Sequence, residues 1–135
     1  NIPEEYNEKG YPYGTTICII STNYNPKSPK QPEYNTTSCK SSYDKSVFGI
    51  YAGKQDMGDS KHMVFAVGDG HILVTSEGGN IEIGDYLTSS SLEGHAMKQD
   101  DNLLHSYTIA KATESVDWSK EKNNKKLISV TYHAA

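Results

Sequence analysis

Acidic side chains in a glycine-rich stretch near the middle of the chain are the residues best suited to chemistry. Asp69 stands between two glycines, and Asp85 directly follows another. Two carboxyl groups whose pKa values are split by proximity or burial can act as a general base and a general acid. Taken singly, each aspartate is also typical of a turn, where its side chain caps its own backbone. His71, two residues after Asp69, is the histidine that we expect to line such a site.

Other patterns that carry chemistry are incomplete. The glycine pair around Asp69 lacks the third glycine, the helix and the lysine of a phosphate loop. The hydroxyl run Thr88–Ser91 has no Gly-x-Ser-x-Gly frame and predicts a polar strand end. The histidines lack the short spacings of a metal site, and they are His62, His71, His95, His105 and His133. We therefore expect no cofactor and no metal.

The composition limits the class of protein. The net charge is -4, and all 13 cationic residues are lysine, whereas nucleic-acid binding normally needs clustered positive charge. No apolar run is long enough to cross a membrane, and the first residues lack the apolar core of a signal peptide. We expect a soluble protein whose partners include neither nucleic acid nor membrane.

The length of 135 residues predicts a single domain over residues 1–135, with an N-terminal arm at 1–14 and a β domain at 15–135. Only 35% of the residues are hydrophobic, yet the chain holds 10 tyrosines. Tyrosine buries a large ring while its hydroxyl keeps a polar partner, which suits interfaces. The composition therefore predicts that part of the stabilising burial lies between chains.

The elements that must position these residues are predicted to be strands. β-Branched and apolar residues predict strands at Thr15–Ser21, Val47–Gly53 and Met63–Val67. The segment Thr22–Ser46 carries three prolines among polar residues and predicts a long surface loop.

The second half of the chain continues this pattern. From Val67 to Ser91, short apolar runs alternate with glycine turns, which predicts a β-meander. Strands are expected at His95–Lys98 and Leu127–His133, while Leu103–Ala112 fits either a helical face or a strand. The predicted fold is an all-β, small antiparallel meander or sandwich-like domain with long loops.

The two cysteines, Cys18 and Cys39, could form one bridge. One pair is too few for a disulfide-built scaffold. Cys18 also lies inside an apolar run, where cysteine behaves as a small buried hydrophobe. We therefore expect free thiols.

Several segments together resemble the C-terminal domain of phage tail-spike and neck-appendage proteins. This family comprises intramolecular chaperones that cleave themselves, and it is classed among the glutamic peptidases. The resemblance covers roughly the last two thirds of the chain. Its segments, in order, are Val47–Gly53, Ala66–Val74, Asn80–Ser90, Gly94–Gln99 and Tyr107–Ala112.

The resemblance implies a homotrimeric domain at the end of a viral spike or fibre. It would help three chains find their register and then be released from the upstream region of the same polypeptide. The family's scissile bond lies just before an Asn, and a Glu three residues further on is catalytic. Asn1 and Glu4 hold those relative positions here. The implied protein is a single-turnover glutamic-type endopeptidase, part of a virion tail precursor assembled in the host cytoplasm.

The chemistry at Asn1 is restricted by its side chain. An acyl shift needs Ser, Thr or Cys directly after the bond, and an Asn that attacks its own carbonyl would cut after itself. Attack by water with two carboxyl groups remains. Glu4 is one candidate and Asp69 is placed first as its partner, in the same or a neighbouring subunit. The other acids left open are Asp85, Asp44 and Glu5.

Two other functions agree with the same sequence. One is a trimeric receptor-binding head of a viral fibre that recognises a host glycan or protein. The other is a trimerisation cap without chemistry. Cleavage predicts that the fragment separates from the mature spike, whereas a receptor-binding tip must stay attached.

Overall fold

A computed structural model describes residues 12–25, 28–54, 62–65 and 68–132. These residues form strands β1 to β9 and two single-turn 3₁₀ helices, η2 (Ser76–Gly78) and η3 (Trp118–Lys120). The predicted all-β class is therefore confirmed. Within the described residues, no helix has the length and apolar character needed to cross a membrane.

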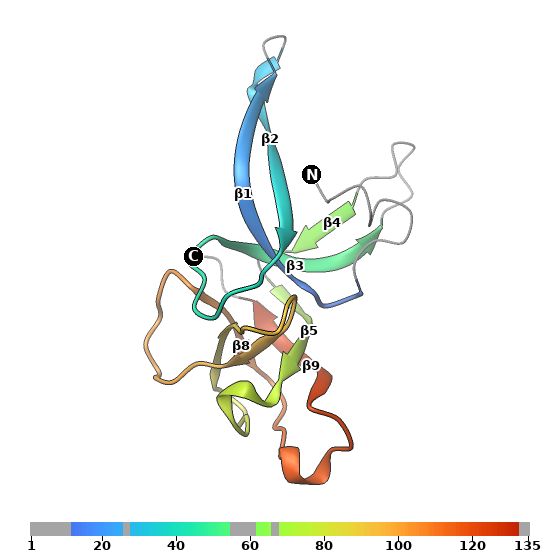
Figure 1. Ribbon diagram of the computed structural model, residues 1–135, viewed down its shortest axis with the longest axis vertical. Coiled ribbons are helices and arrows are strands. Elements are labelled where there is room, and N and C mark those ends of the chain that lie inside the picture. Colours follow the sequence, from blue (N-terminus) through green and yellow to red (C-terminus); the bar gives the residue numbers. More distant parts are fainter. Residues whose placement is uncertain (1–11, 26–27, 55–61, 66–67, 133–135) are drawn as a thin grey trace.

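The first half of the chain forms an antiparallel sheet in the order β2-β1-β3-β4. Its strands are β1 (Thr16–Asn25), β2 (Ser28–Ser38), β3 (Val47–Lys54) and β4 (His62–Phe65). β1 pairs with β3 only over Thr16–Cys18. The outer part of the β1–β2 hairpin therefore projects from the body as a two-stranded ribbon (Figure 1).

The prediction of a long loop at Thr22–Ser46 is wrong, because β1 runs on to Asn25 and β2 occupies most of the remainder. β2 is an edge strand, where proline is tolerated. Moreover, Pro29 and Pro32 fall between the pairs Asn25↔Ser28 and Asn23↔Glu33, where the two strands are out of register. Their missing N–H groups therefore cost the ribbon no regular hydrogen bond.

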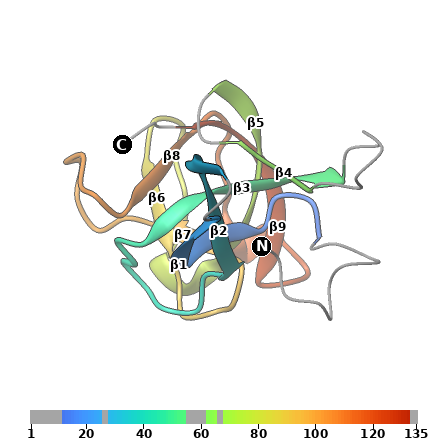
Figure 2. The same ribbon diagram turned by 90° about the horizontal axis from the view of Figure 1, so that it is seen from above.

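The second half of the chain forms a closed barrel in the order β5-β7-β6-β8-β9. Figure 2 looks onto this barrel along the ribbon. β7 is short, and it pairs with β5 in parallel at a single position, Val74↔Ala96. The barrel strands are β5 (Gly68–Thr75), β6 (Tyr86–Ser89), β7 (Ala96–Lys98), β8 (Thr108–Ala112) and β9 (Lys125–Tyr132).

The predicted meander is also wrong. β5 and β6 are not neighbours in the barrel, and the long partner of β5 is the last strand, β9. Ile81 makes only an isolated bridge to Val116. In the segment between β5 and β6, a turn is held by the Asp85 carboxylate, which accepts a hydrogen bond from the Glu82 N–H at 2.8 Å. The expected strands at 47–53, 95–98 and 127–133 agree with β3, β7 and β9, and the ambiguous 103–112 segment is a strand only from Thr108 onward.

The expectation of free thiols is contradicted, because Cys18 and Cys39 form a disulfide with a Cα–Cα distance of 5.1 Å. The unexpected hairpin explains the error, since β2 returns the chain to the foot of β1. There the Cys39 N–H donates to the Thr16 carbonyl at 2.9 Å. The disulfide therefore joins the two strands of the ribbon at its base.

The core fills the barrel and extends to the first sheet. Alternate residues of β5 and β9 point inward, and Ile50 of β3 joins the same cluster. The strap that precedes β1 also connects the two sheets, since the Gly14 N–H donates to the Tyr51 carbonyl and the Gly14 carbonyl accepts from the Leu73 N–H, both at 2.9 Å. The inward residues of β5 and β9 in the cluster are Ile72, Val74, Ile128, Val130 and Tyr132.

Two β-bulges place apolar side chains on the surface of the first sheet. Ile20 is the extra residue between the pairs Ile19↔Thr36 and Ser21↔Asn35. Phe48 is the extra residue where β3 passes β1. A bulge re-aims the side chain that it carries, and Ile20 and Phe48 are 65% and 37% exposed.

Candidate functional site

The outer face of the β5–β9 pair is polar where β5 begins. Asp69 lies opposite Thr131, and His71 lies opposite Ser129. Successive side chains of a strand point to opposite faces, so Asp69 and His71 share the outer face while Ile72 points into the core. Both Asp69 and His71 are exposed.

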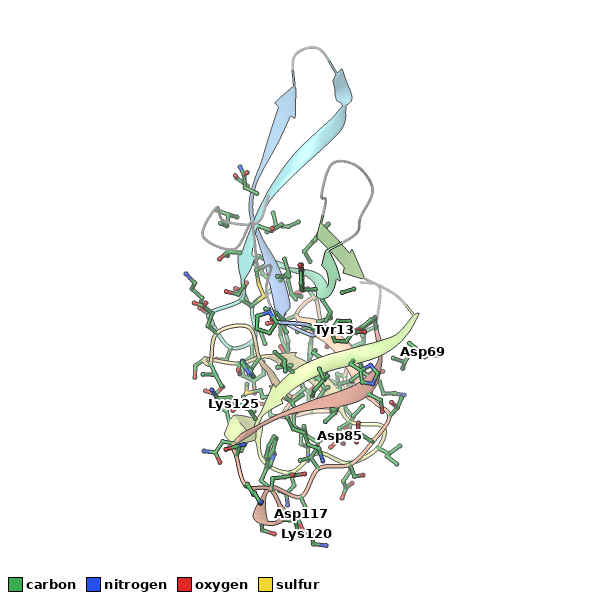
Figure 3. The ribbon with its side chains drawn as sticks, turned by 90° about the vertical axis from the view of Figure 1, so that its right-hand side faces the viewer. Tyr13, Asp69, Asp85, Asp117, Lys120 and Lys125 are labelled. Atoms are coloured by element: carbon green, nitrogen blue, oxygen red, sulfur yellow. A yellow bond between two sulfur atoms is a disulfide. The ribbon has the colours of Figure 1, made fainter. Side chains whose placement is uncertain are left out.

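A hollow of about 540 Å³ opens on this face and is called here the β5–β9 hollow. It brings together Asp69 and His71, two of the residues singled out from the sequence. Tyr13 closes one side, with its ring centroid 6.1 Å from that of His71. Figure 3 shows Tyr13 and Asp69 beside β5, whereas Asp85 lies nearer the end of the barrel that carries Asp117 and Lys120. The hollow is lined by Tyr13, Asp69, Gly70, His71, Thr113, Ser129 and Val130.

The strap Pro12–Thr15 holds Tyr13 at the hollow. The Thr15 N–H and hydroxyl both donate to the Pro12 carbonyl, at 3.2 and 2.6 Å. Gly14 has a φ of +89°, and an added Cβ would lie 2.7 Å from the Leu127 Cδ1. Glycine is therefore favoured at position 14, chiefly because the backbone conformation is one that residues with a side chain rarely adopt. The chain that follows the N-terminal arm is thus fixed beside Asp69.

The backbone of His71 is fixed by a side chain from inside the barrel. Its N–H donates to the Tyr132 hydroxyl at 2.9 Å, and that hydroxyl donates to the His71 carbonyl at 2.7 Å. These groups face the edge of β5 that the short β7 leaves unpaired. Gly70 permits the arrangement, because an added Cβ would lie 2.6 Å from carbons of the Tyr132 ring. Burial raises the pKa of Tyr132, so its hydroxyl stays protonated and can donate.

The acids predicted from the sequence are placed very differently. Asn1, Glu4 and Glu5 lie outside the described residues. The Asp44 carboxylate accepts from the Ser46 N–H and hydroxyl, at 2.9 and 2.6 Å, and therefore caps a turn. Asp85 caps the turn before β6 and lies 3.7 Å from the Lys98 ammonium.

Asp69 differs from both of these acids. No hydrogen bond or ion pair to another described residue engages its carboxylate. The carboxylate is exposed at the hollow. Among the candidate acids that the structure describes, Asp69 is therefore the one whose carboxylate is available for chemistry.

Hydroxyl groups on the far wall of the hollow were not singled out from the sequence. The Thr113 hydroxyl donates to the Ser129 hydroxyl at 2.8 Å, and the Ser129 N–H donates to the Glu114 carboxylate at 2.6 Å. Only the register His71↔Ser129 brings Ser129 to the site. The sequence gives no local signal for such a pairing.

A second polar cluster, in the loop between β7 and β8, was also missed. The His105 Nε2 lies 2.9 Å from the Asp101 Oδ2, and its ring stacks on Tyr107 at 4.6 Å. Hydrogen bonds from His105 and from the Leu103 N–H hold the pKa of Asp101 below its usual range. The buried Gln99 amide donates to the Asp101 carboxylate at 2.8 Å. These groups satisfy one another, so the cluster fixes the loop rather than opening a site.

No group of three or more histidine, cysteine or carboxylate side chains in the described part of the chain could hold a metal ion. No family model matches the chain, and no curated protein or solved structure matches it either. The family resemblance therefore depends on the sequence segments given above, and the chemistry depends on the geometry of the β5–β9 hollow.

Proposed function

We propose that this chain is the C-terminal intramolecular chaperone of a viral tail spike or fibre. It promotes trimerisation of the spike and is released by autoproteolysis just before Asn1. The ordered sequence segments suggest the family. The observation that carries the chemistry is the strap, which leads the chain that follows the arm to the hollow where no other described residue engages the Asp69 carboxylate.

The arm is long enough for this reaction. Glu4 precedes Tyr13 by nine residues, and nine extended residues span at most about 30 Å. Glu4 and the bond before Asn1 can therefore reach the β5–β9 hollow of the same chain. In a trimer the hollow that receives them could instead belong to a neighbouring copy, which the coexpression experiment below tests.

The reaction is attack of water on the carbonyl carbon that precedes Asn1. One carboxylate takes a proton from the water as the new C–O bond forms, and the other carboxyl group gives a proton to the Asn1 nitrogen as the C–N bond breaks. Glu4 and Asp69 supply these two groups. Each chain is cut once, so the released fragment is not a general peptidase.

Trimerisation is supported by the exposed apolar residues of the first sheet. Ile20 is 65% exposed on a strand whose outer part pairs only with β2. A two-stranded ribbon is marginally stable in water by itself. Packing against a second and a third copy would cover it.

The test uses a longer chain that carries residues upstream of Asn1. Intact mass over time should show a fragment that starts at Asn1. Glu4→Gln and Asp69→Asn should each slow its appearance by at least about 100-fold, whereas Glu82→Gln, a change in an exposed turn, should not. If Glu4→Gln and Asp69→Asn are both cut at the parental rate, the assignment is wrong.

Coexpression of the two variants locates the acids. If Glu4 acts with the Asp69 of a neighbouring copy, mixed trimers of Glu4→Gln and Asp69→Asn chains contain complete sites and recover cleavage. If both acids act within one chain, no complete site forms and the mixture stays whole.

The projecting ribbon favours a second candidate function, a trimeric receptor-binding head. Such a head must remain on the mature particle. Recovery of the domain still covalently joined to purified spikes would favour this function over release.

A further inference from the structure

We infer that the hydroxyl of Ser129 and the ring N–H of His71 form the oxyanion-binding pair of the proposed self-cleavage. The inference rests on the proposed function and adds a role that the two carboxyl groups do not fill. When water attacks the carbonyl carbon before Asn1, an electron pair moves onto the carbonyl oxygen. Hydrogen-bond donors aimed at that oxygen stabilise the transition state.

Ser129 and His71 are placed to act together. They lie directly opposite each other on β9 and β5. The backbone N–H of His71 points away from β9 and donates to the Tyr132 hydroxyl. The backbone N–H and carbonyl of Ser129 point away from β5 and bond to Glu114 and Thr113. Their pairing is therefore of the kind without mutual backbone hydrogen bonds, which brings opposite side chains closest. Both residues line the β5–β9 hollow.

The Ser129 hydroxyl is prepared to donate. It accepts a hydrogen bond from the Thr113 hydroxyl at 2.8 Å, which leaves its own proton free to point into the hollow. A hydroxyl that already accepts a hydrogen bond is polarised and becomes a better donor. The chain of hydrogen bonds from Thr113 through Ser129 to the carbonyl oxygen therefore needs no rearrangement when negative charge develops on that oxygen.

Both donors have fixed backbones, which is what preorganisation requires. The Ser129 N–H donates to Glu114 at 2.6 Å, and its carbonyl accepts from the Thr113 N–H at 3.1 Å. His71 is held twice by the Tyr132 hydroxyl. Each proposed donor is therefore carried by a main chain that hydrogen bonds to other residues hold in place.

The test is the rate of self-cleavage of the longer chain. Ser129→Ala should lower this rate by about 10² to 10³, the usual loss for one oxyanion donor, whereas Ser129→Thr should retain most of it. His71→Leu should also lose rate, and His71→Gln should lose less because its amide N–H can donate. Ser119→Ala is the control, because the Ser119 hydroxyl donates to the Asp117 carboxylate in η3 and does not line the hollow.

The outcomes separate this inference from the proposed function. If the chain cleaves and Asp69→Asn blocks it, but Ser129→Ala cuts at the parental rate, the oxyanion role is wrong and the proposed function stands. If hydroxylamine traps an acyl ester on Ser129, the residue is a nucleophile and the inference is overturned. If the longer chain never cleaves, both fall. Urea unfolding of Ser129→Ala should match the parent, and a large loss of stability would assign Ser129 a structural role instead.

Discussion

Tyr132→Phe removes one oxygen atom and should destabilise the barrel measurably. The Tyr132 hydroxyl makes two hydrogen bonds to the His71 backbone, at 2.9 and 2.7 Å, and the residue is only 6% exposed. These two hydrogen bonds lie at the edge of β5 that β7 leaves unpaired. Phenylalanine keeps the ring in place but leaves a backbone donor and acceptor without their partner.

The size of the effect follows from those two hydrogen bonds. Each contributes about 0.5 to 1.5 kcal/mol, and water at the sheet edge replaces part of the loss. We therefore expect the free energy of unfolding to fall by about 1 to 2 kcal/mol. Gly70→Ala should cost at least as much, because its Cβ would lie 2.6 Å from carbons of the Tyr132 ring and would push the ring away.

Equilibrium unfolding in urea measures both changes. With a slope of about 2 kcal/mol/M, Tyr132→Phe should lower the midpoint by about 0.5 to 1 M without changing the slope. Because Gly70→Ala already displaces the hydroxyl, the double variant should lose less than the sum of the single changes. Tyr107→Phe is the control, because Tyr107 is placed by ring contacts with Tyr43 and His105. A midpoint for Tyr132→Phe within 0.1 M of the parent, roughly the scatter of such curves, would refute the reasoning.

Three further changes have definite expected outcomes. Serine at both Cys18 and Cys39 should lower the free energy of unfolding by about 3 kcal/mol in urea, because the bond joins residues 21 apart; equal stability with and without reductant would contradict this. Asp101→Asn should flatten the acid limb of the stability curve. The pKa of Asp101 is lowered by His105, so its contribution is present above about pH 4 and is lost as the pH falls further; an unchanged limb would contradict the assignment. Gly14→Ala should cost about 1 to 2 kcal/mol in urea because φ is +89°, and a parental midpoint would show that the strap is not held as described.

Local patterns in the sequence predicted the all-β class and several strands correctly. The apolar and β-branched runs at 47–53 and 127–132 are strands in the structure. The pairing could not be predicted, because it depends on residues far apart in the chain. β9 pairs with β5 along its whole length across 49 intervening residues between Thr75 and Lys125, and no local signal in either strand specifies the other. The meander was inferred from neighbours in sequence that are not neighbours in space.

The candidate site was partly visible for a similar reason. The two glycines around Asp69 marked an acid in an exposed position, and His71 follows on the same face of one strand. Ser129 belongs to another strand, and only the register brings it opposite His71. The free thiol predicted for Cys39 was wrong because the prolines of β2 indicated a loop, whereas β2 is the strand that brings Cys39 back to Cys18.

The prolines of β2 also limit how the domain can meet copies of itself. In the proposed trimer, three such domains would be held at a high local concentration, and a long edge strand would then invite further chains to add to the sheet. Pro29 and Pro32 lack the N–H groups that such growth requires, and they lie where β2 departs from its register with β1. The ribbon can therefore meet its partners through side chains while its edge ends the sheet, which keeps the proposed assembly finite rather than fibrillar.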